Sequence, residues 1–116
     1  ATSISHDSHN IIVVGADEAS MAAAVNRVVE LNGGIVVWDG GGVAAEVPLA
    51  IAGIMSDEPL TVVNTQLEAA KSKAHALGVN PNIDPFMTLS FMALPVIPSL
   101  RITTRGVFDV TTQSYV

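Results

Sequence analysis

Hydrophobic positions in the first half of the chain follow the spacing of strands and of one helix. An unbroken run of mostly β-branched residues at 11–15 predicts a buried strand. Asp17 is expected to cap the helix that follows, and the Asn-Gly-Gly at 32–34 to end it, because these residues accept left-handed backbone conformations. The apolar residues that recur every three or four positions predict its buried face: Met21, Val25, Val28 and Val29.

Two further apolar runs, at 35–38 and 43–49, predict a pair of strands. They are separated by Asp39-Gly40-Gly41-Gly42, which predicts a tight turn and therefore an antiparallel hairpin. The same glycine run lacks the Lys and the Ser or Thr of a phosphate-binding loop, and it opens no helix. We therefore interpret it as a turn alone.

A long helix is predicted to follow residue 56. Ser56 can cap it, and Asp57 and Glu58 would then lie in the first turn, where the helix dipole favours negative charge. These two carboxylates are adjacent in sequence and do not face each other, which argues against a general acid and base pair. Gly78 is expected to end the helix. Its predicted apolar face consists of Leu60, Val63, Leu67, Ala70, Ala74 and Leu77.

A third helix is predicted to begin at Asp84, which is followed by a proline at the first helical position. Residues 86–94 are apolar on nearly every side, so we expect a helix buried all round. The alternative is an apolar interface, with Thr88 and Ser90 forming hydrogen bonds across it.

With closing strands at 100–103 and 107–110, these elements predict an α/β fold. We expect a mixed β-sheet with one clear hairpin, packed against two or three helices. A chain of 116 residues suits a single domain, 1–116.

The chain is short of charge for its size. Charged residues make up 14% and apolar residues 49% of the sequence, whereas ordinary globular domains contain about 25% charged residues. A small domain has the most surface per volume, so the shortage suggests that part of this surface is covered. We expect a homo-oligomer or partner binding, through residues 86–94 and 96–97.

The net charge limits the kinds of partner that the chain is expected to bind. The net charge is −6 and the five Lys and Arg are scattered, so neither a nucleic acid polymer nor an anionic membrane surface is expected to bind. No apolar run approaches the roughly 20 residues that span a bilayer. The absence of cysteine fits a cytoplasmic location. The first residue is Ala1 and residues 2–5 already alternate like a strand, so we expect a segment cut from a longer chain.

The densest group of chemically capable side chains stands at His6, Asp7, Ser8, His9 and Asn10. Three interpretations remain open. The two imidazoles could share a metal, but residues three apart face opposite sides of an extended segment, and further ligands would be needed. Asp7 and Asn10 could cap backbone groups in a turn. The loop could instead contact a ligand held elsewhere. No second cluster completes a catalytic site in this chain.

Several stretches together resemble the C-terminal domain of bacterial adenine deaminases, in the amidohydrolase superfamily. The similarity covers nearly the whole chain in the family's order. The matching stretches are residues 5–15, 24–27, 33–37, 48–59, 84–98 and 106–110.

The resemblance implies a longer enzyme that hydrolyses adenine to hypoxanthine and ammonia. Its metal site would lie in an N-terminal (β/α)₈ barrel, where manganese or iron would activate the attacking water. No residue of this chain matches a barrel motif, so the resemblance implies no catalytic residue, metal ligand or cofactor here. It implies that residues 6–10 form a family signature, and we expect this loop to face the active site.

Two functions follow from these observations. The chain could be a C-terminal accessory domain of an adenine deaminase, inactive alone, with its own barrel domain as partner. Alternatively, it could be an independent small-ligand binding or regulatory module without catalysis. A self-contained enzyme is a weaker hypothesis, because a single polar cluster rarely suffices.

Overall fold

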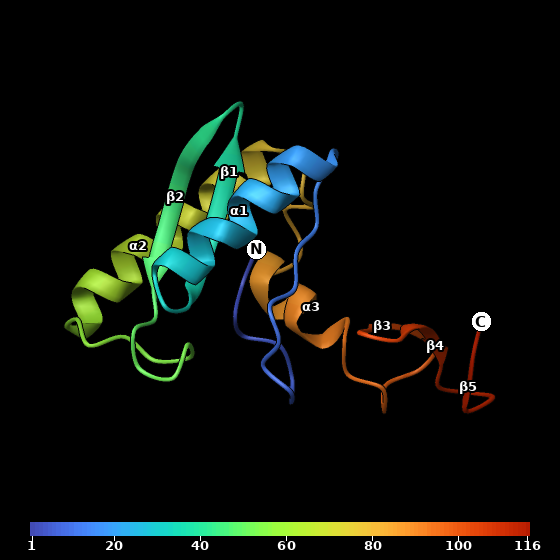
Figure 1. The fold of residues 1–116 in the computed structure, drawn as a ribbon. Coiled ribbons are helices and arrows are strands. Elements are labelled where there is room, and N and C mark those ends of the chain that lie inside the picture. Colours follow the sequence, from blue (N-terminus) through green and yellow to red (C-terminus); the bar gives the residue numbers. More distant parts are fainter.

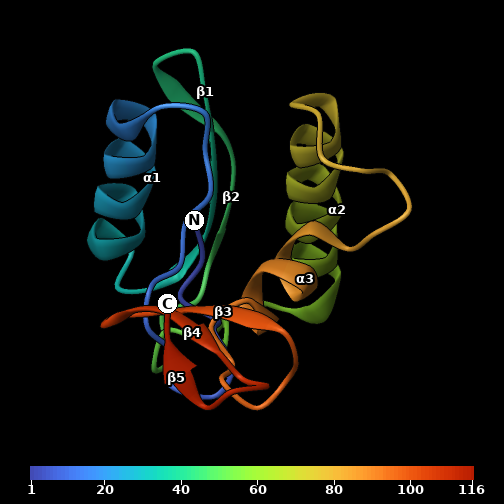
Figure 2. The same cartoon turned by 90° about the vertical axis from the view of Figure 1, so that its right-hand side faces the viewer.

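A β-hairpin lies at the centre of the fold, between two helices. The computed structural model describes all 116 residues. Figure 1 shows the order of the elements along the chain, and Figure 2 shows α1 and α2 on opposite faces of the hairpin. The elements are α1 (Glu18–Glu30), β1 (Gly34–Asp39), β2 (Gly42–Pro48), α2 (Leu60–Ala76), α3 (Pro85–Phe91), β3 (Leu100–Thr103), β4 (Gly106–Asp109) and β5 (Ser114–Tyr115). No helix is both long enough and apolar enough to cross a membrane.

The predicted hairpin is confirmed. β1 and β2 pair antiparallel, and Gly40 and Gly41 form the turn with positive φ angles. Val37 pairs with Ala45 but Trp38 pairs with Val43, so Ala44 is an extra residue that forms a bulge in β2.

The N-terminal segment extends this hairpin on the side of β1. Thr2 forms isolated antiparallel bridges to Ile35 on one side and to Ile12 on the other. The prediction of a buried strand over 11–15 is wrong, because only Ile12 pairs, and Val14 is 70% exposed. The chain leaves the sheet after Ile12 to reach α1, so the β-branched residues that follow have no neighbouring strand.

The α/β class is confirmed, with the sheet divided in two. All pairings are antiparallel: β1 pairs with β2, and β3, β4 and β5 form a separate three-stranded sheet in that order. The expected mixed sheet does not form as one unit. The turns at 92–99 carry the chain away from the first hairpin, so the C-terminal strands pair with one another.

Two of the three predicted helix starts are confirmed. The Asp17 carboxylate accepts a hydrogen bond from the Ser20 backbone N–H at 2.8 Å, and α1 begins there. The Asp84 carboxylate accepts from the backbone N–H groups of Phe86 and Met87, and Pro85 is the first residue of α3. Both signals are local, because each acid binds a backbone group two or three residues ahead.

The predicted cap of the second helix is wrong. α2 begins at Leu60 after Pro59, and no side chain caps it. The Ser56 hydroxyl instead accepts from the Glu58 backbone N–H at 3.1 Å, closing a small turn before the helix. No acidic residue therefore lies in the first turn of α2.

The core consists of two clusters, one on each face of the hairpin. Side chains alternate along β1, so Ile35 and Val37 pack toward α2 while Val36 packs toward α1. The buried members of the clusters are Ile35, Val37, Val47, Leu49, Ala70 and Ala74 on one face, and Ala24, Val28 and Val36 on the other. Val29, predicted to be buried, is 58% exposed because α1 contacts the hairpin along a narrower stripe.

The prediction that the third helix is buried all round is wrong. α3 ends at Phe91, Met87 is 55% exposed and Met92 is 40% exposed. Among the elements of secondary structure α3 packs mainly against α2, so only part of its surface is covered. Its buried residues are Pro85 and Ser90.

The junction after α1 is closely packed, and Gly33 is its narrowest point. A Cβ atom at Gly33, whose φ is +119°, would lie 2.3 Å from the Gly53 Cα. We predict that Gly33→Ala lowers the free energy of unfolding by at least about 2 kcal/mol, because a positive φ and a backbone clash add together. Urea unfolding of the chain measures this loss.

Gly40→Ala is the matched control, because Gly40 also has a positive φ (+58°) but no atom within 4 Å of the added Cβ. It should cost only about 1 kcal/mol. Equal losses for the two variants would contradict the packing described here.

Candidate functional site

The polar loop at 6–10 lies within a longer loop whose two ends are joined. The Thr2 N–H donates to the Ile12 carbonyl at 2.9 Å, and the Ile12 N–H donates back to the Thr2 carbonyl at 3.0 Å. Residues 3–11 thus leave and return to the same place beside β1. The two ends of the loop are therefore held by the strand pairing beside β1.

His6 ties the loop to α3. Its ring stacks on the Phe91 ring, with centroids 4.8 Å apart and an interplanar angle of 11°. Its backbone N–H donates to the Ser90 carbonyl at 3.0 Å. The His6 ring is half-buried and its two nitrogens form no hydrogen bond within the chain.

His9 closes the tight turn at the tip of the loop. Its backbone N–H donates to the Ser5 carbonyl at 2.6 Å, and its Nδ1 accepts from the Ser5 backbone N–H at 3.4 Å. His9 has a φ of +50°, in the left-handed region. Its ring centroid is 5.9 Å from that of His6.

Asp7, Ser8 and Asn10 are exposed, and their side chains form no hydrogen bond within the chain. The interpretation that Asp7 and Asn10 cap backbone groups is therefore wrong. Among the five polar residues, only His9 uses its side chain to stabilise the turn. The loop closes through backbone groups, which leaves a carboxylate, a hydroxyl and an amide available for other contacts.

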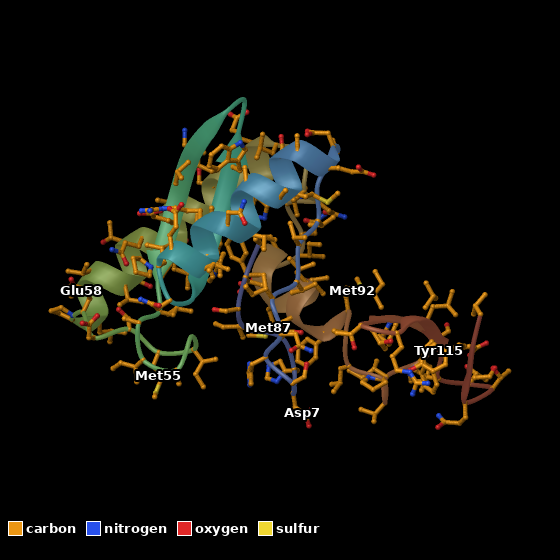
Figure 3. All side chains as sticks on the ribbon, in the orientation of Figure 1. Asp7, Met55, Glu58, Met87, Met92 and Tyr115 are labelled. Atoms are coloured by element: carbon orange, nitrogen blue, oxygen red, sulfur yellow. The ribbon has the colours of Figure 1, made fainter.

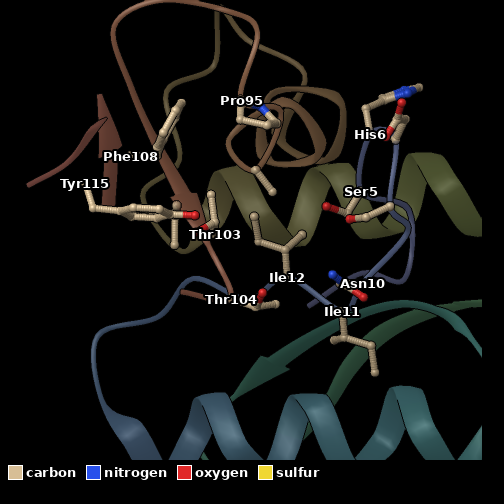
Figure 4. Close-up of a pocket in the computed structure, with 14 residues that line it drawn as sticks. Ser5, His6, Asn10, Ile11, Ile12, Pro95, Thr103, Thr104, Phe108 and Tyr115 are labelled. Carbon is tan, nitrogen blue, oxygen red and sulfur yellow. The ribbon is translucent and has the colours of Figure 1, made fainter. Parts of the chain in front are cut away.

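A cavity of about 550 Å³ separates this loop from the C-terminal sheet. Figure 4 shows Ser5, His6 and Asn10 on one side of it, with Phe108 and Tyr115 across from them. The complete lining is Ser5, His6, Asp7, Ser8, Asn10, Ile11, Ile12, Ala93, Pro95, Ile102, Thr103, Thr104, Phe108 and Tyr115.

Ser5 is the only fully buried polar residue in this lining, at 0% exposure, and its Oγ has no hydrogen-bond partner. A buried hydroxyl without a partner costs free energy, so such groups mark places where a water or a ligand belongs. No local sequence signal marks the far wall, because Phe108 and Tyr115 lie about a hundred residues from the loop.

The residues present do not assemble a metal site. No group of three or more His, Asp or Glu side chains is placed to hold an ion. His75, the third histidine, lies on α2, where its Nε2 is 3.2 Å from the Ile83 carbonyl oxygen.

Large apolar side chains are exposed around the loop and the cavity. Figure 3 shows Met55 and the loop residue Asp7 on the same, lower side of the molecule. Twelve of the twenty exposed large apolar residues fall into two segments, one formed by Ile51, Ile54, Met55, Leu60 and Val62, and the other by Met87, Met92, Val96, Ile97, Leu100, Ile102 and Val107. The sequence predicted the start of the second segment and missed the first.

Exposed apolar side chains beside unpaired polar groups are typical of a domain surface that contacts another protein or a ligand. The comparison with known proteins identifies the family of this domain. Residues 1–114 match the family described as the adenine deaminase C-terminal domain. The chain belongs to this family, and the resemblance found in the sequence is confirmed.

The chain is also similar to curated adenine deaminases over nearly its full length. It is 49% identical to the adenine deaminase of Nitratidesulfovibrio vulgaris strain Hildenborough over 116 residues, which cover 99% of this chain and 20% of that protein. The identity is 50% for Desulfatibacillum aliphaticivorans, over 100% of this chain and 20% of that protein. It is 48% for Bacillus subtilis strain 168, over 95% of this chain and 19% of that protein. The chain thus spans about a fifth of the length of these relatives.

Proposed function

We propose that this chain is the C-terminal accessory domain, residues 1–116, of an adenine deaminase that hydrolyses adenine to hypoxanthine and ammonia. The observation that carries the proposal is the match of about 50% identity over the whole chain to adenine deaminases five times its length. The relatives compared above are all adenine deaminases, which favours this function over an independent ligand-binding module.

The catalytic machinery belongs, in this proposal, to an N-terminal barrel domain that holds a divalent metal, manganese or iron. The side chains of the present chain support this assignment of the metal to the barrel, because no third ligand lies beside His6 and His9 to complete a metal site. We place the enzyme in the cytoplasm, in purine salvage. The exposed apolar segments are proposed to contact the barrel domain and, in a homo-oligomer, a second copy.

The loop at residues 6–10 is proposed to face the mouth of the barrel. Its support is the set of side chains left free: His6, Asp7, Ser8 and Asn10 form no side-chain hydrogen bond in this chain. A neutral imidazole offers a donor on one nitrogen and an acceptor on the other, so His6 can bind the edge of a purine or orient a neighbouring group. The loop would thus position the substrate, while the metal and proton chemistry takes place in the barrel.

The first prediction concerns activity. The full-length protein should release ammonia and hypoxanthine from adenine, whereas the 116-residue chain supplied with Mn²⁺ or Fe²⁺ should not, because it lacks a metal-binding set. Chromatographic detection of hypoxanthine measures both. Production of hypoxanthine by the pure chain, abolished by a chelator, would contradict the division of roles.

A second prediction separates a substrate-facing loop from a purely structural one. In the full-length protein, His6→Gln should lower kcat/KM at least about tenfold, roughly 1.4 kcal/mol of transition-state stabilisation. The free energy of unfolding should fall by only about 1 kcal/mol, because the variant loses the stacking on Phe91 but no side-chain hydrogen bond. His9→Asn tests the second histidine in the same way, at the cost of the weak 3.4 Å bond to Ser5.

His75→Gln is the matched control for both variants, because this histidine lies on α2 away from the loop. It should turn over adenine like the wild type. Variants of His6 and His9 that lose stability but turn over adenine normally once folded would show that the loop is structural.

A further inference from the structure

The cavity between the loop and the C-terminal sheet combines flat apolar walls with free polar groups. Phe108 and Tyr115 form one wall, with ring centroids 5.2 Å apart, and Ile12 and Pro95 add apolar surface. The volume of about 550 Å³ falls within the roughly 300–1,000 Å³ typical of small-molecule sites. Such walls favour a flat ring, because aromatic rings pack well against one another in stacked or edge-on arrangements.

Seven of the fourteen lining residues have a polar side chain, in addition to the Tyr115 hydroxyl, and they lie on both sides of the cavity. Asn10 offers an amide with donors and an acceptor, and its side chain has no partner in the chain. The Tyr115 hydroxyl lies near Thr103 in Figure 4, and the buried Ser5 Oγ has no partner. This mixture of donors and acceptors suits a heterocycle that carries both kinds of group on its edge.

The charges around the cavity disfavour a phosphorylated ligand. Asp7 is the only charged residue in the lining, and the chain carries a net charge of −6. The nearest cation, Arg105, lies over the Tyr115 ring with its guanidinium carbon 5.2 Å from the ring centroid. Neither Arg nor Lys lines the cavity, although phosphate sites depend on such groups.

We propose that this cavity binds an uncharged purine base, with the ring against Phe108 and Tyr115 and its polar edge toward Asn10 and Ser5. The choice of a purine rests on the proposed function, whereas the existence of the site rests on the cavity. The residues of this chain suffice to bind the base, so the domain takes up substrate or product itself in addition to contacting the barrel.

The test is a titration of the isotope-labelled 116-residue chain with hypoxanthine, followed by amide chemical shifts. Shifts should change at residues 5–10, 102–104 and 115 and not in α2, with a dissociation constant on the order of 1 mM. Asn10→Ala and Tyr115→Ala should each weaken binding about fivefold or more. Both residues are exposed, so the variants should fold.

Asn64→Ala, an exposed asparagine on α2, is the matched control and should bind like the wild type. A purine 5′-monophosphate should bind more weakly than the free base. A folded chain without shifts at these residues, a chain that does not fold alone, or tighter binding of the monophosphate would each overturn the proposal.

The full-length protein is titrated in the same way, and its deamination of adenine is measured separately. The first measurement tests the cavity and the second tests the proposed function. Turnover without loop and cavity shifts would overturn the cavity alone. Shifts without turnover would overturn the proposed activity while supporting the site.

Discussion

The pair of hydrogen bonds between Thr2 and Ile12 closes the polar loop of this domain and holds its two ends together. These bonds, at 2.9 and 3.0 Å, close the loop at residues 3–11, and the Thr2–Ile35 bridge attaches its closed end to the edge of β1. The neighbouring Ser3 secures the same region, because its Oγ accepts from the Gly34 N–H at 2.8 Å and donates to the Gly53 carbonyl at 2.5 Å. A loop anchored in this way can carry free polar side chains without losing its position.

Features set by neighbouring residues could be predicted from the sequence. Asp17 and Asp84 cap helices through backbone groups two or three residues away, and the glycines at 40–42 make the hairpin turn. The strand at 11–15 and the Ser56 cap could not be predicted correctly, because pairing partners and the competing turn at Glu58 decide them. The composition of a segment does not specify whether a neighbouring strand exists.

The candidate site, too, could be predicted only where its residues are adjacent in the sequence. The cluster at residues 6–10 was visible because its members are adjacent in sequence. The opposite wall, with Phe108 and Tyr115, comes from the other end of the chain and has no motif of its own. The freedom of the Asp7 and Asn10 side chains was also beyond prediction, since their residue types are common in turns that they cap.

The positions of the exposed apolar residues explain why so few residues of this chain are charged. Many of these residues lie in two segments, at 51–62 and 87–107, and a surface of this kind is stabilised when another protein covers it. The relatives that the chain matches are about five times its length, and in the function proposed here the remaining four fifths of such a protein cover this surface. Polar loop and apolar segments together then form one docking face in the account proposed here.

Hydrogen exchange measures that face most directly. In the isolated chain the backbone N–H groups of residues 7, 8, 10 and 11 donate no hydrogen bond to the rest of the chain and should exchange rapidly. In the full-length protein the same groups should be protected, while the hairpin tip at residues 40–41 exchanges equally fast in both. Rapid exchange of residues 7, 8, 10 and 11 in the full-length protein would show that the loop faces solvent, and would contradict the account.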